Sequence, residues 1–596
     1  MSKNLKSLFI TLPQRDKPDN FPPYGPLAVI TALRKAGYIE STLYNLDVLR
    51  PTRQEALDYI VSVRPDILGI SAPVSTSYEN CKFFSTEVKR LLPGTIIILG
   101  GNMAASAEII LKKTGVDFCV LGEGEEVCCQ LFDKLSGGEQ RSAFCNIKGL
   151  AFLDGDRMVI TGYAEQLPKE RIYDVDWNIC DRASVENYFP RIKDIVKTSA
   201  YYKYFFPYDG DSNDFVKEDI SNKTVGVISC SKGCIGRCTF CHRFTAGLRI
   251  VPVEIIIARI KELISRFNVG AIAFADECFG ANALWLRKFC EMIKPLKIRW
   301  KVGGMRVDMV TPELIEVMKD AGCRTIIYGM ETGSKRMLEV MEKKVSLNKN
   351  YNAVKWTVEA GVFTTPVLVL GMPGETSETI KETASFIAYS KTINSYQNPR
   401  DISITFAQAL PGTPLYEYAR SIGKIGSTID EEEKYLYEIS NRNASDETTT
   451  LNLTGYPKLV YFSWHLFIRV IVNHEVVRKF GIRQFHEIVF HNGEKPSLIE
   501  LLRNRKVNEV IYLYPRLIYR LRHFLWGIVF VKSLKRHGAV KSLELLAEYV
   551  SFALPGLLSA RPKSIFKYKS LRKIMENDLG NSYSGSKEMI SLRKGR

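Results

Sequence analysis

Short apolar runs alternate with longer segments of helical periodicity along the first 140 residues. The apolar runs, which we expect to be strands, lie at residues 8–10, 43–46, 67–71, 96–101 and 118–122. Apolar strands separated by helices are typical of a parallel sheet that carries helices on both faces. Residues 1–140 are therefore predicted to form one doubly wound α/β domain.

A second series of the same kind occupies residues 223–425. Its strand-like runs lie at residues 224–229, 271–275, 298–302, 325–329, 365–370 and 402–407. Each run is followed by a helical pattern, so the segment contains six β/α units. Repeated units of this kind can close into a partial barrel, with the chemistry at the carboxyl ends of its strands.

The remaining residues form two further segments. Residues 141–222 are interpreted as a connector with a small hairpin, which the runs 147–152 and 158–160 form. Residues 426–596 are predicted to be mostly helical, with aromatic and basic residues interleaved. A chain of 596 residues is long enough for these three domains and the connector.

The net charge of +17 is concentrated at one end of the chain. From residue 451 to residue 596 there are 26 Lys and Arg against 10 Asp and Glu, so the first 450 residues are nearly neutral. Three interpretations of this basic segment stay open: it lies on an anionic membrane, it binds nucleic acid, or it covers the barrel with its charges solvated. Nucleic acid is the least favoured, because the sequence contains no recognised nucleic-acid motif.

The 13 cysteines have no disulfide-like spacing, which favours reduced thiols and a cytoplasmic location. No run reaches the roughly 18 apolar residues that a membrane-spanning helix needs. We therefore expect a cytoplasmic protein, and the basic segment allows peripheral association with a membrane.

Three cysteines lie close together after the first strand of the predicted barrel: Cys234, Cys238 and Cys241. Their C-x3-C-x2-C spacing allows three thiolates to bind three irons of a 4Fe-4S cluster, and it leaves the fourth iron open to a small molecule. A structural zinc site is the alternative, with Cys230 or His242 as the fourth ligand.

This spacing, with the aromatic Phe240 directly before the last cysteine, resembles the signature of the radical S-adenosylmethionine (radical SAM) enzymes. The resemblance implies that the open iron binds S-adenosylmethionine. It also implies that Asp276 and Glu277, after the second strand, approach the methionine ammonium and that Glu331, after the fourth, contacts the ribose. For the two adjacent acids, a role at the start of a helix is the plain alternative.

The first domain resembles the cobalamin-binding domain that precedes many radical SAM barrels, in four pieces at residues 22–27, 65–71, 100–101 and 122–125. The resemblance implies that cobalamin lies beyond the carboxyl ends of the strands, against these candidates: Ser71, Ser75, Thr76, Gly100, Gly101, Gly122 and Glu123. All seven histidines lie at or after His242, so no histidine of this domain can bind the cobalt. The alternative is a Rossmann-like module that has lost its cofactor or binds another.

Together, the two resemblances imply a class B radical SAM methyltransferase or a relative of the anaerobic Mg-protoporphyrin ester cyclases. Such a methyltransferase cleaves S-adenosylmethionine to a 5′-deoxyadenosyl radical and uses cobalamin to methylate an unactivated carbon. The alternatives are radical cyclisation or oxidation of a lipid or tetrapyrrole-like substrate without methyl transfer, and a cluster protein that is not an enzyme. The implied partners are a small-molecule or lipid substrate and an electron donor such as flavodoxin or ferredoxin.

Overall fold

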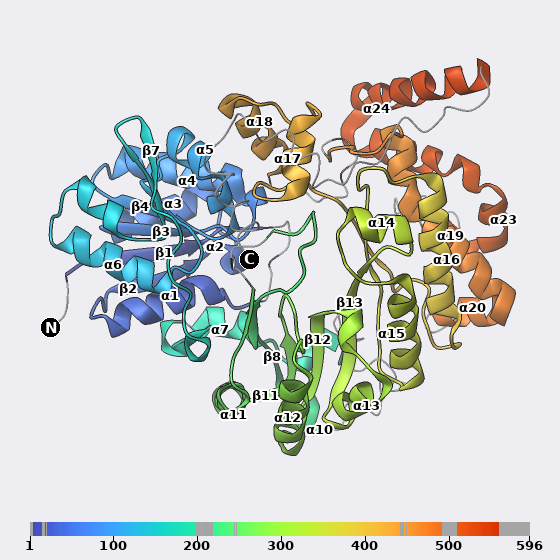
Figure 1. The fold of residues 1–596 in the computed structure, drawn as a ribbon, viewed down its shortest axis with the longest axis horizontal. Coiled ribbons are helices and arrows are strands. Elements are labelled where there is room, and N and C mark those ends of the chain that lie inside the picture. The colour runs from blue at the N-terminus through green and yellow to red at the C-terminus, as the bar shows by residue number, and fades with distance from the viewer. Residues whose placement is uncertain are drawn as a thin grey trace.

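The computed structural model describes residues 4–14, 18, 21–180, 182–196, 204–205, 218–242, 245, 247–440, 446, 448, 450–490 and 509–558. This part of the chain contains two largely parallel sheets, each covered by helices, and a group of helices that follows the second sheet (Figure 1).

The first sheet has seven strands in the order β2-β1-β3-β4-β5-β6-β7. Five of them are parallel: β1 (Ser7–Thr11), β2 (Ser41–Asn45), β3 (Ile67–Ser71), β4 (Ile96–Gly100) and β5 (Phe118–Val120). The helices of this domain are α1 (Tyr24–Lys35), α2 (Leu46–Leu49), α3 (Arg53–Val63), α4 (Tyr78–Leu91), α5 (Ala107–Lys113) and α6 (Glu125–Ser136). Every residue of β1 and β5 is buried between helical layers, which explains why the interior positions of β1 and all of β5 are apolar. The predicted doubly wound α/β architecture is confirmed.

An antiparallel hairpin extends this sheet beyond its parallel strands. It consists of β6 (Leu150–Asp154) and β7 (Arg157–Ile160), and β6 pairs with β5 so that Phe152 lies opposite Phe118. The sequence predicts this hairpin but assigns it to the connector. The structure joins it to the first sheet, because the apolar side chains of β6 are buried beside β5. Within its described residues, the connector also contains the helices α7 (Arg182–Tyr188), α8 (Ile192–Val196) and α10 (Glu218–Ser221).

The second sheet has six strands, all parallel, in the order β15-β14-β13-β12-β11-β8. They are β8 (Thr224–Ile228), β11 (Val269–Phe274), β12 (Arg299–Met305), β13 (Cys323–Glu331), β14 (Val367–Leu370) and β15 (Ser403–Phe406). The helices that alternate with them are α11 (Val253–Phe267), α12 (Ala283–Ile293), α13 (Pro312–Asp320), α14 (Lys335–Val340), α15 (Leu347–Glu359), α16 (Ser377–Thr392) and α17 (Pro414–Ser421). Because β8 and β15 do not pair with each other, the sheet is an open half-barrel, as the six β/α units predict.

The first domain packs against the carboxyl side of the half-barrel. One apolar core contains residues of β1 and β3 together with residues of α14, of the loop after β14 and of α18 (Ile429–Ile439). Members of this shared core are Leu8, Ile70, Met341, Met372 and Leu436. The carboxyl ends of both sheets therefore lie near the boundary between the two domains.

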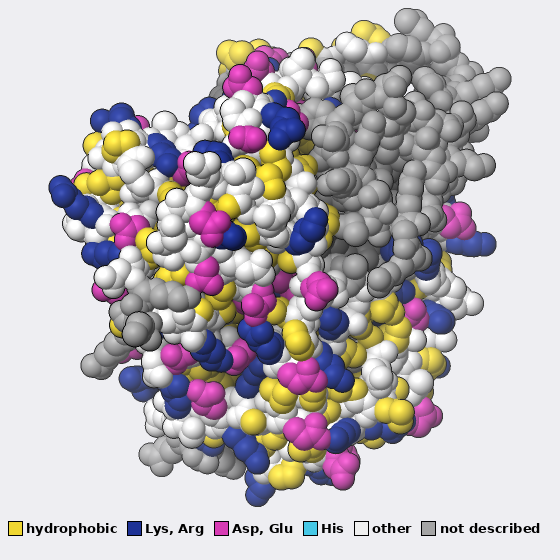
Figure 2. Space-filling model, turned by 60° about the vertical axis from the view of Figure 1, so that its left-hand side comes forward, with side chains coloured by type: hydrophobic (Ala, Val, Ile, Leu, Met, Phe, Trp, Pro, Cys, Tyr) yellow, Lys and Arg dark blue, Asp and Glu magenta, His cyan; other side chains and the backbone are white. Residues whose placement is uncertain are grey.

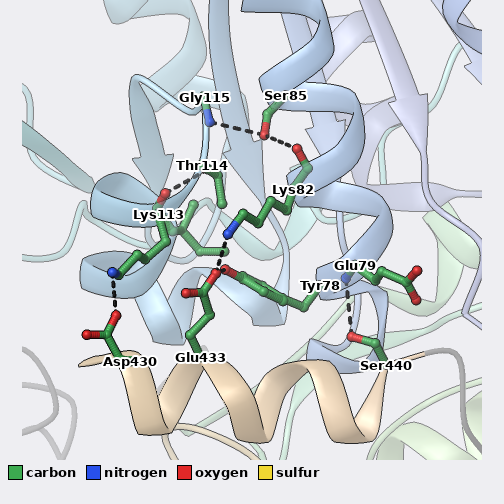
Figure 3. Close-up of polar contacts among 11 residues, drawn as sticks. Tyr78, Glu79, Lys82, Ser85, Lys113, Thr114, Gly115, Asp430, Glu433 and Ser440 are labelled. Atoms are coloured by element: carbon green, nitrogen blue, oxygen red, sulfur yellow. Dashed lines mark hydrogen bonds and ion pairs between the residues drawn. The ribbon is translucent and has the colours of Figure 1, made fainter. Parts of the chain in front are cut away.

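Polar contacts strengthen the same boundary where α18 lies along α4 and α5 (Figure 3). The Tyr78 hydroxyl donates to the Glu433 carboxylate at 2.6 Å, and Lys82 Nζ pairs with the same carboxylate at 2.5 Å. Lys113 forms a second ion pair, with Asp430, at 2.5 Å. The helix that follows the barrel is thus connected to the first domain at two places.

The C-terminal helices that the structure describes are α19 (Lys458–Phe480), α20 (Ile482–Val489), α22 (Val510–Leu513), α23 (Pro515–Arg520) and α24 (Trp526–Leu558), which a kink at Gly538 divides in two. Of these, α19 lies beside the edge strand β15, where the ring of Phe406 is 4.9 Å from that of Tyr461 and 4.7 Å from that of Phe462. This helix covers a strand edge that would otherwise be open. It supports the interpretation that part of the basic segment covers the barrel. Within the described ranges, no helix is both long and apolar enough to cross a membrane.

Candidate cofactor site

The three cysteines of the predicted cluster motif lie on one loop beyond β8. The base of this loop is closed by two short antiparallel strands, β9 (Ser231–Gly233) and β10 (Leu248–Ile250). Cys238 is buried, Cys234 is partly exposed and Cys241 is exposed. Among the described residues, no three His, Cys, Asp or Glu side chains are gathered around one point. The assignment of the three cysteines as cluster ligands therefore stays a prediction.

Gly236 brings two of these sulfurs close to a buried guanidinium. Its amide donates to Cys234 Sγ at 3.3 Å. A Cβ atom at this glycine would lie 3.5 Å from Cys234 Sγ, 3.8 Å from Cys238 Sγ and 3.0 Å from Arg306 Nη1. Two hydrogen bonds of 3.0 Å from Arg306 to Asp308 hold the guanidinium in place. Positive charge and N–H donors of this kind stabilise thiolates, which are the form that binds iron.

Asp276 lies just beyond β11 and offers one oxygen to a ligand. Its Oδ1 accepts hydrogen bonds from the amide of Cys230 at 2.9 Å and from the hydroxyl of Ser231 at 2.6 Å. Its Oδ2 is buried and has no partner in the described part of the chain. Burial raises the pKa of Asp276 to about 7, and the charge of the exposed Glu277 adds to this effect. Since a buried carboxylate oxygen without a partner is costly, the site fits a cationic group such as the ammonium of S-adenosylmethionine.

Glu331 ends β13 in a strained conformation. Its φ of 64° lies in the left-handed region, which costs a residue other than glycine about 1–3 kcal/mol. Its carboxylate forms an ion pair of 2.7 Å with Lys343, and both side chains are nearly buried. Gly329 leaves room for this arrangement, because a Cβ atom there would lie 2.6 Å from Glu331 Oε1. Strain at the carboxyl end of a barrel strand supports the prediction of a ligand contact at this residue.

Two other residues near the cysteine loop, Phe240 and Cys278, are packed into the protein. Phe240 is partly buried against the core that the two domains share. Cys278 is fully buried, and a hydrogen bond with Cys234, together with burial, raises the pKa of its thiol. Free cysteine behaves as a small apolar residue, which is consistent with the burial of Cys278.

A cavity of about 500 Å³ opens at the carboxyl ends of β1, β3, β4 and β5. Of the residues predicted to contact cobalamin, the following line it: Ser71, Gly100, Gly101, Gly122 and Glu123. A Cβ atom at Gly100 would meet no atom within 4 Å, so the backbone there leaves open space for a ligand. Ser75 and Thr76 are buried in a 3-10 turn (Ser75–Ser77) and do not line the cavity.

The cavity reaches the cysteine loop through an ion-pair cluster that the sequence alone does not reveal. Glu123 Oε1 pairs with Lys232 of β9 at 2.9 Å and with Arg249 of β10 at 2.6 Å. Glu123 Oε2 accepts from Arg249 at 3.1 Å and from the amide of Leu167 at 2.7 Å. Lys232 and Tyr173 also line the cavity. The hairpin that closes the base of the cysteine loop is therefore fixed to the domain that holds the cavity.

Comparison with known sequence families agrees with this arrangement. Residues 228–387 match the Radical SAM superfamily, and residues 18–132 match the B12 binding domain. The chain therefore contains a radical SAM domain and a B12-binding domain. Its cofactors are accordingly a 4Fe-4S cluster, S-adenosylmethionine and cobalamin, which the buried Asp276 oxygen and the cavity of the first domain fit.

Curated relatives include both cyclases and methyltransferases. The chain is 25% identical over 373 residues to the anaerobic magnesium-protoporphyrin IX monomethyl ester cyclase of Cereibacter sphaeroides, a match that covers 61% of this chain and 56% of the relative. It is 26% identical over 362 residues to a protein of Pyrococcus horikoshii named uncharacterized methyltransferase, covering 60% and 69%. It is 21% identical over 336 residues to the cytidylyl-2-hydroxyethylphosphonate methyltransferase of Streptomyces wedmorensis, covering 55% and 62%. The chain thus spans little more than half of the cyclase and up to about two thirds of the methyltransferases.

Two solved structures share the fold. The cobalamin-dependent S-adenosylmethionine radical enzyme OxsB, with aqua-cobalamin and S-adenosylmethionine bound, superposes with a TM-score of 0.57 at 15% identity and covers 99% of this chain and 83% of that chain. The radical S-adenosylmethionine methyltransferase TsrM of Kitasatospora setae, with cobalamin and the cluster bound, gives a TM-score of 0.53 at 17% identity over 72% of this chain and 76% of that chain.

Proposed function

We propose that the protein is a cobalamin-dependent radical SAM enzyme that methylates an unactivated carbon of a small-molecule or lipid substrate. The observation that supports this most strongly is the hairpin of β9 and β10, which borders both the cavity of the first domain and the cysteine loop. When bound, the cofactors supply reductive cleavage of S-adenosylmethionine, which yields a 5′-deoxyadenosyl radical, and a transferable methyl group. Because one hairpin borders both sites, the radical and the methyl group can act on the same substrate.

The side chains of this chain hold and orient these groups. In the proposal, the three cysteines of the loop bind the iron, Asp276 accepts hydrogen bonds from the ammonium of S-adenosylmethionine, and Glu331 contacts the ribose. Glycines at the strand ends allow cobalamin to approach the backbone of the first domain. The division that we propose is a cobalamin-binding domain at 1–140, a connector at 141–222, a radical SAM barrel at 223–425 and a C-terminal domain at 426–596. The hairpin at 150–160 belongs to the first sheet.

A second candidate function is radical cyclisation or oxidation without methyl transfer, on a lipid or tetrapyrrole-like substrate. It is supported by the similarity to a protein named as a magnesium-protoporphyrin ester cyclase. The same side chains serve both reactions, because the two differ in whether a methyl group is transferred.

The partners belong to the proposal as well. The reductive step needs a one-electron donor, for which we propose a flavodoxin or a ferredoxin in the cytoplasm. We further propose that the basic C-terminal segment makes a peripheral contact with a membrane, because a lipid or other poorly soluble substrate is concentrated there.

The test uses the full chain, reconstituted anaerobically and reduced with dithionite, with S-adenosylmethionine that carries a deuterated methyl group. Lipid extracts and tetrapyrrole esters serve as candidate substrates, and the Cys234→Ala variant is the control. Formation of 5′-deoxyadenosine with deuterium in the product supports methylation. Formation of 5′-deoxyadenosine with an unlabelled, oxidised product establishes the second candidate instead, and no 5′-deoxyadenosine from the cluster-loaded chain refutes both.

A further inference from the structure

The helices α23 and α24 carry a surface that is both basic and apolar. Between residues 510 and 543 the chain has seven Lys and Arg and no Asp or Glu. On the face of the molecule that Figure 2 presents, by contrast, acidic and basic side chains are mixed. Residues 510–543 therefore differ from that face in carrying only basic charged side chains.

Large apolar side chains of the same stretch are exposed. We call them, together with the basic residues beside them, the docking face. Its apolar members, with their exposed fractions, are Tyr514 (45%), Leu517 (53%), Leu521 (46%), Phe524 (67%), Val531 (38%) and Leu534 (41%). Its basic members on the surface are Arg516, Arg520, Lys535 and Lys541, whereas the neighbouring Arg536 is paired with Asp446 at 3.3 Å. Contiguous exposed apolar side chains are uncommon on soluble proteins and mark contact surfaces.

The opposite side of these helices is packed, so the docking face is held in one orientation. Leu525, Val529 and Ser533 of this segment are buried. The ring of His474 in α19 stacks on that of Tyr519 at 3.7 Å. A kink at Gly538 divides α24 into two helices, and the Trp526 ring of the first stacks on the Tyr549 ring of the second at 4.4 Å. The exposed apolar residues are therefore displayed by an ordered helical layer.

The position of α24 relates the docking face to the mouth of the half-barrel. The second helix of α24, beyond the kink at Gly538, packs back on Trp526 through Tyr549, and the Phe552 ring on this second helix lies 5.8 Å from the ring of Tyr456. The Tyr456 hydroxyl accepts a hydrogen bond from the amide of Ser377 at 3.5 Å. Ser377 begins α16, directly after the loop at the carboxyl end of β14. Figure 1 likewise places α24 on the side of the barrel where α14 follows the carboxyl end of β13.

We infer that the docking face binds the surface of an anionic lipid bilayer and sets the mouth of the half-barrel toward the membrane. Basic side chains meet the lipid phosphates, and the apolar side chains enter the boundary between headgroups and acyl chains. Nucleic acid offers the same negative charge but no apolar layer for residues such as Leu521 and Phe524. We also infer that the substrate is a membrane lipid or another amphiphile taken from the bilayer, and this part of the inference rests on the proposed function.

The test is co-sedimentation of the full, cluster-loaded chain with vesicles of phosphatidylcholine alone or with added phosphatidylglycerol. We expect binding only to the anionic vesicles, and weaker binding as the salt concentration rises. The double variant Leu521→Glu with Phe524→Glu should bind the anionic vesicles at least roughly tenfold more weakly than the wild type. It removes apolar contact with the bilayer and adds negative charge that the anionic lipids repel. Leu284→Glu is the matched control, because Leu284 is an exposed leucine (81%) on α12, outside the docking face.

Iron content and 5′-deoxyadenosine formation of each variant show whether it is folded and active. Failure of the wild type to bind anionic vesicles at low salt, or equal binding by the double variant, overturns the docking face while leaving the radical chemistry intact. Gel filtration identifies the other occupants: a wild-type dimer that the double variant abolishes, with no vesicle binding, would assign the face to a second copy. Binding to DNA that exceeds binding to vesicles would assign it to nucleic acid. Vesicle binding without 5′-deoxyadenosine formation in any variant would instead contradict the proposed function alone.

Discussion

Replacing Glu123 by Gln tests the ion pairs that connect the first domain to the base of the cysteine loop. The substitution keeps the shape of the side chain but removes the negative charge between Lys232 and Arg249. Those two side chains are only 20% and 16% exposed, so water compensates little for the loss. Breaking a buried ion pair costs about 3–5 kcal/mol, and the remaining exposure of the two cations reduces this to about 2–3 kcal/mol.

Amide hydrogen exchange measures this free energy locally, at Leu167, which donates to Glu123, and in β9 and β10. A loss of 2–3 kcal/mol in the free energy of local opening corresponds to roughly 30- to 140-fold faster exchange. Glu87→Gln is the matched control, because Glu87 pairs with Arg90 on the surface at 2.8 Å, and such a pair contributes about 0–1 kcal/mol. Exchange at Leu167 and the hairpin that is no faster in the Glu123 variant than in the Glu87 variant would refute this reasoning.

The same cluster predicts a dependence on pH. Burial alone would raise the pKa of Glu123, but the hydrogen bond from Arg249 and the charge of Lys232 outweigh it and lower the pKa below 4.5. A depressed folded-state pKa contributes stability above the unfolded value, and that stability is lost as the pH falls through the folded value. Protection of the hairpin in the wild type should therefore fall below about pH 4.5 toward that of the Gln variant, which should change little in this range.

Three further predictions concern the site and the domain boundary. Alanine at any of the three cysteines of the loop should abolish iron binding after anaerobic reconstitution, and a variant with the full iron content would refute that ligand. Asp276→Asn should weaken binding of S-adenosylmethionine without loss of iron, and wild-type affinity should rise as the pH passes about 7, where the carboxylate ionises; equal affinities across this range would exclude the contact. Glu433→Gln should weaken the attachment of α18 to the first domain by about 1–3 kcal/mol, because Tyr78 and Lys82 share that carboxylate. Amide exchange in α18 measures this loss against the exposed control Glu438→Gln, and equal exchange in the two variants would contradict it.

Much of the fold could be predicted from the sequence, because local periodicity encodes it. The run at 67–71 coincides with β3 and the run at 96–101 matches β4 to within one residue, since strands that helices cover on both faces are largely apolar. The runs at 147–152 and 158–160 predict the hairpin of β6 and β7 as an element, but not as part of the first sheet. Antiparallel pairing of β6 with β5 depends on a tertiary neighbour, which periodicity within the hairpin does not specify.

The candidate site could be predicted only where residues are close together in sequence. The three cysteines and Asp276 lie next to predicted strands, and their chemistry follows from that placement. The pairing of Glu123 with Arg249 joins residues 126 positions apart and leaves no signal in a single sequence. Position after a strand can also mislead. Ser75 and Thr76 follow a strand as expected, but they are buried in a 3-10 turn and do not line the cavity.

The metal content of the reconstituted full chain tests the central claim most directly, namely that one chain holds both a cluster and cobalamin. The chain is incubated anaerobically with iron, sulfide and cobalamin, passed through gel filtration, and analysed for iron and cobalt. We predict about four irons and about one cobalt per chain. Full iron with no retained cobalt would contradict the claim.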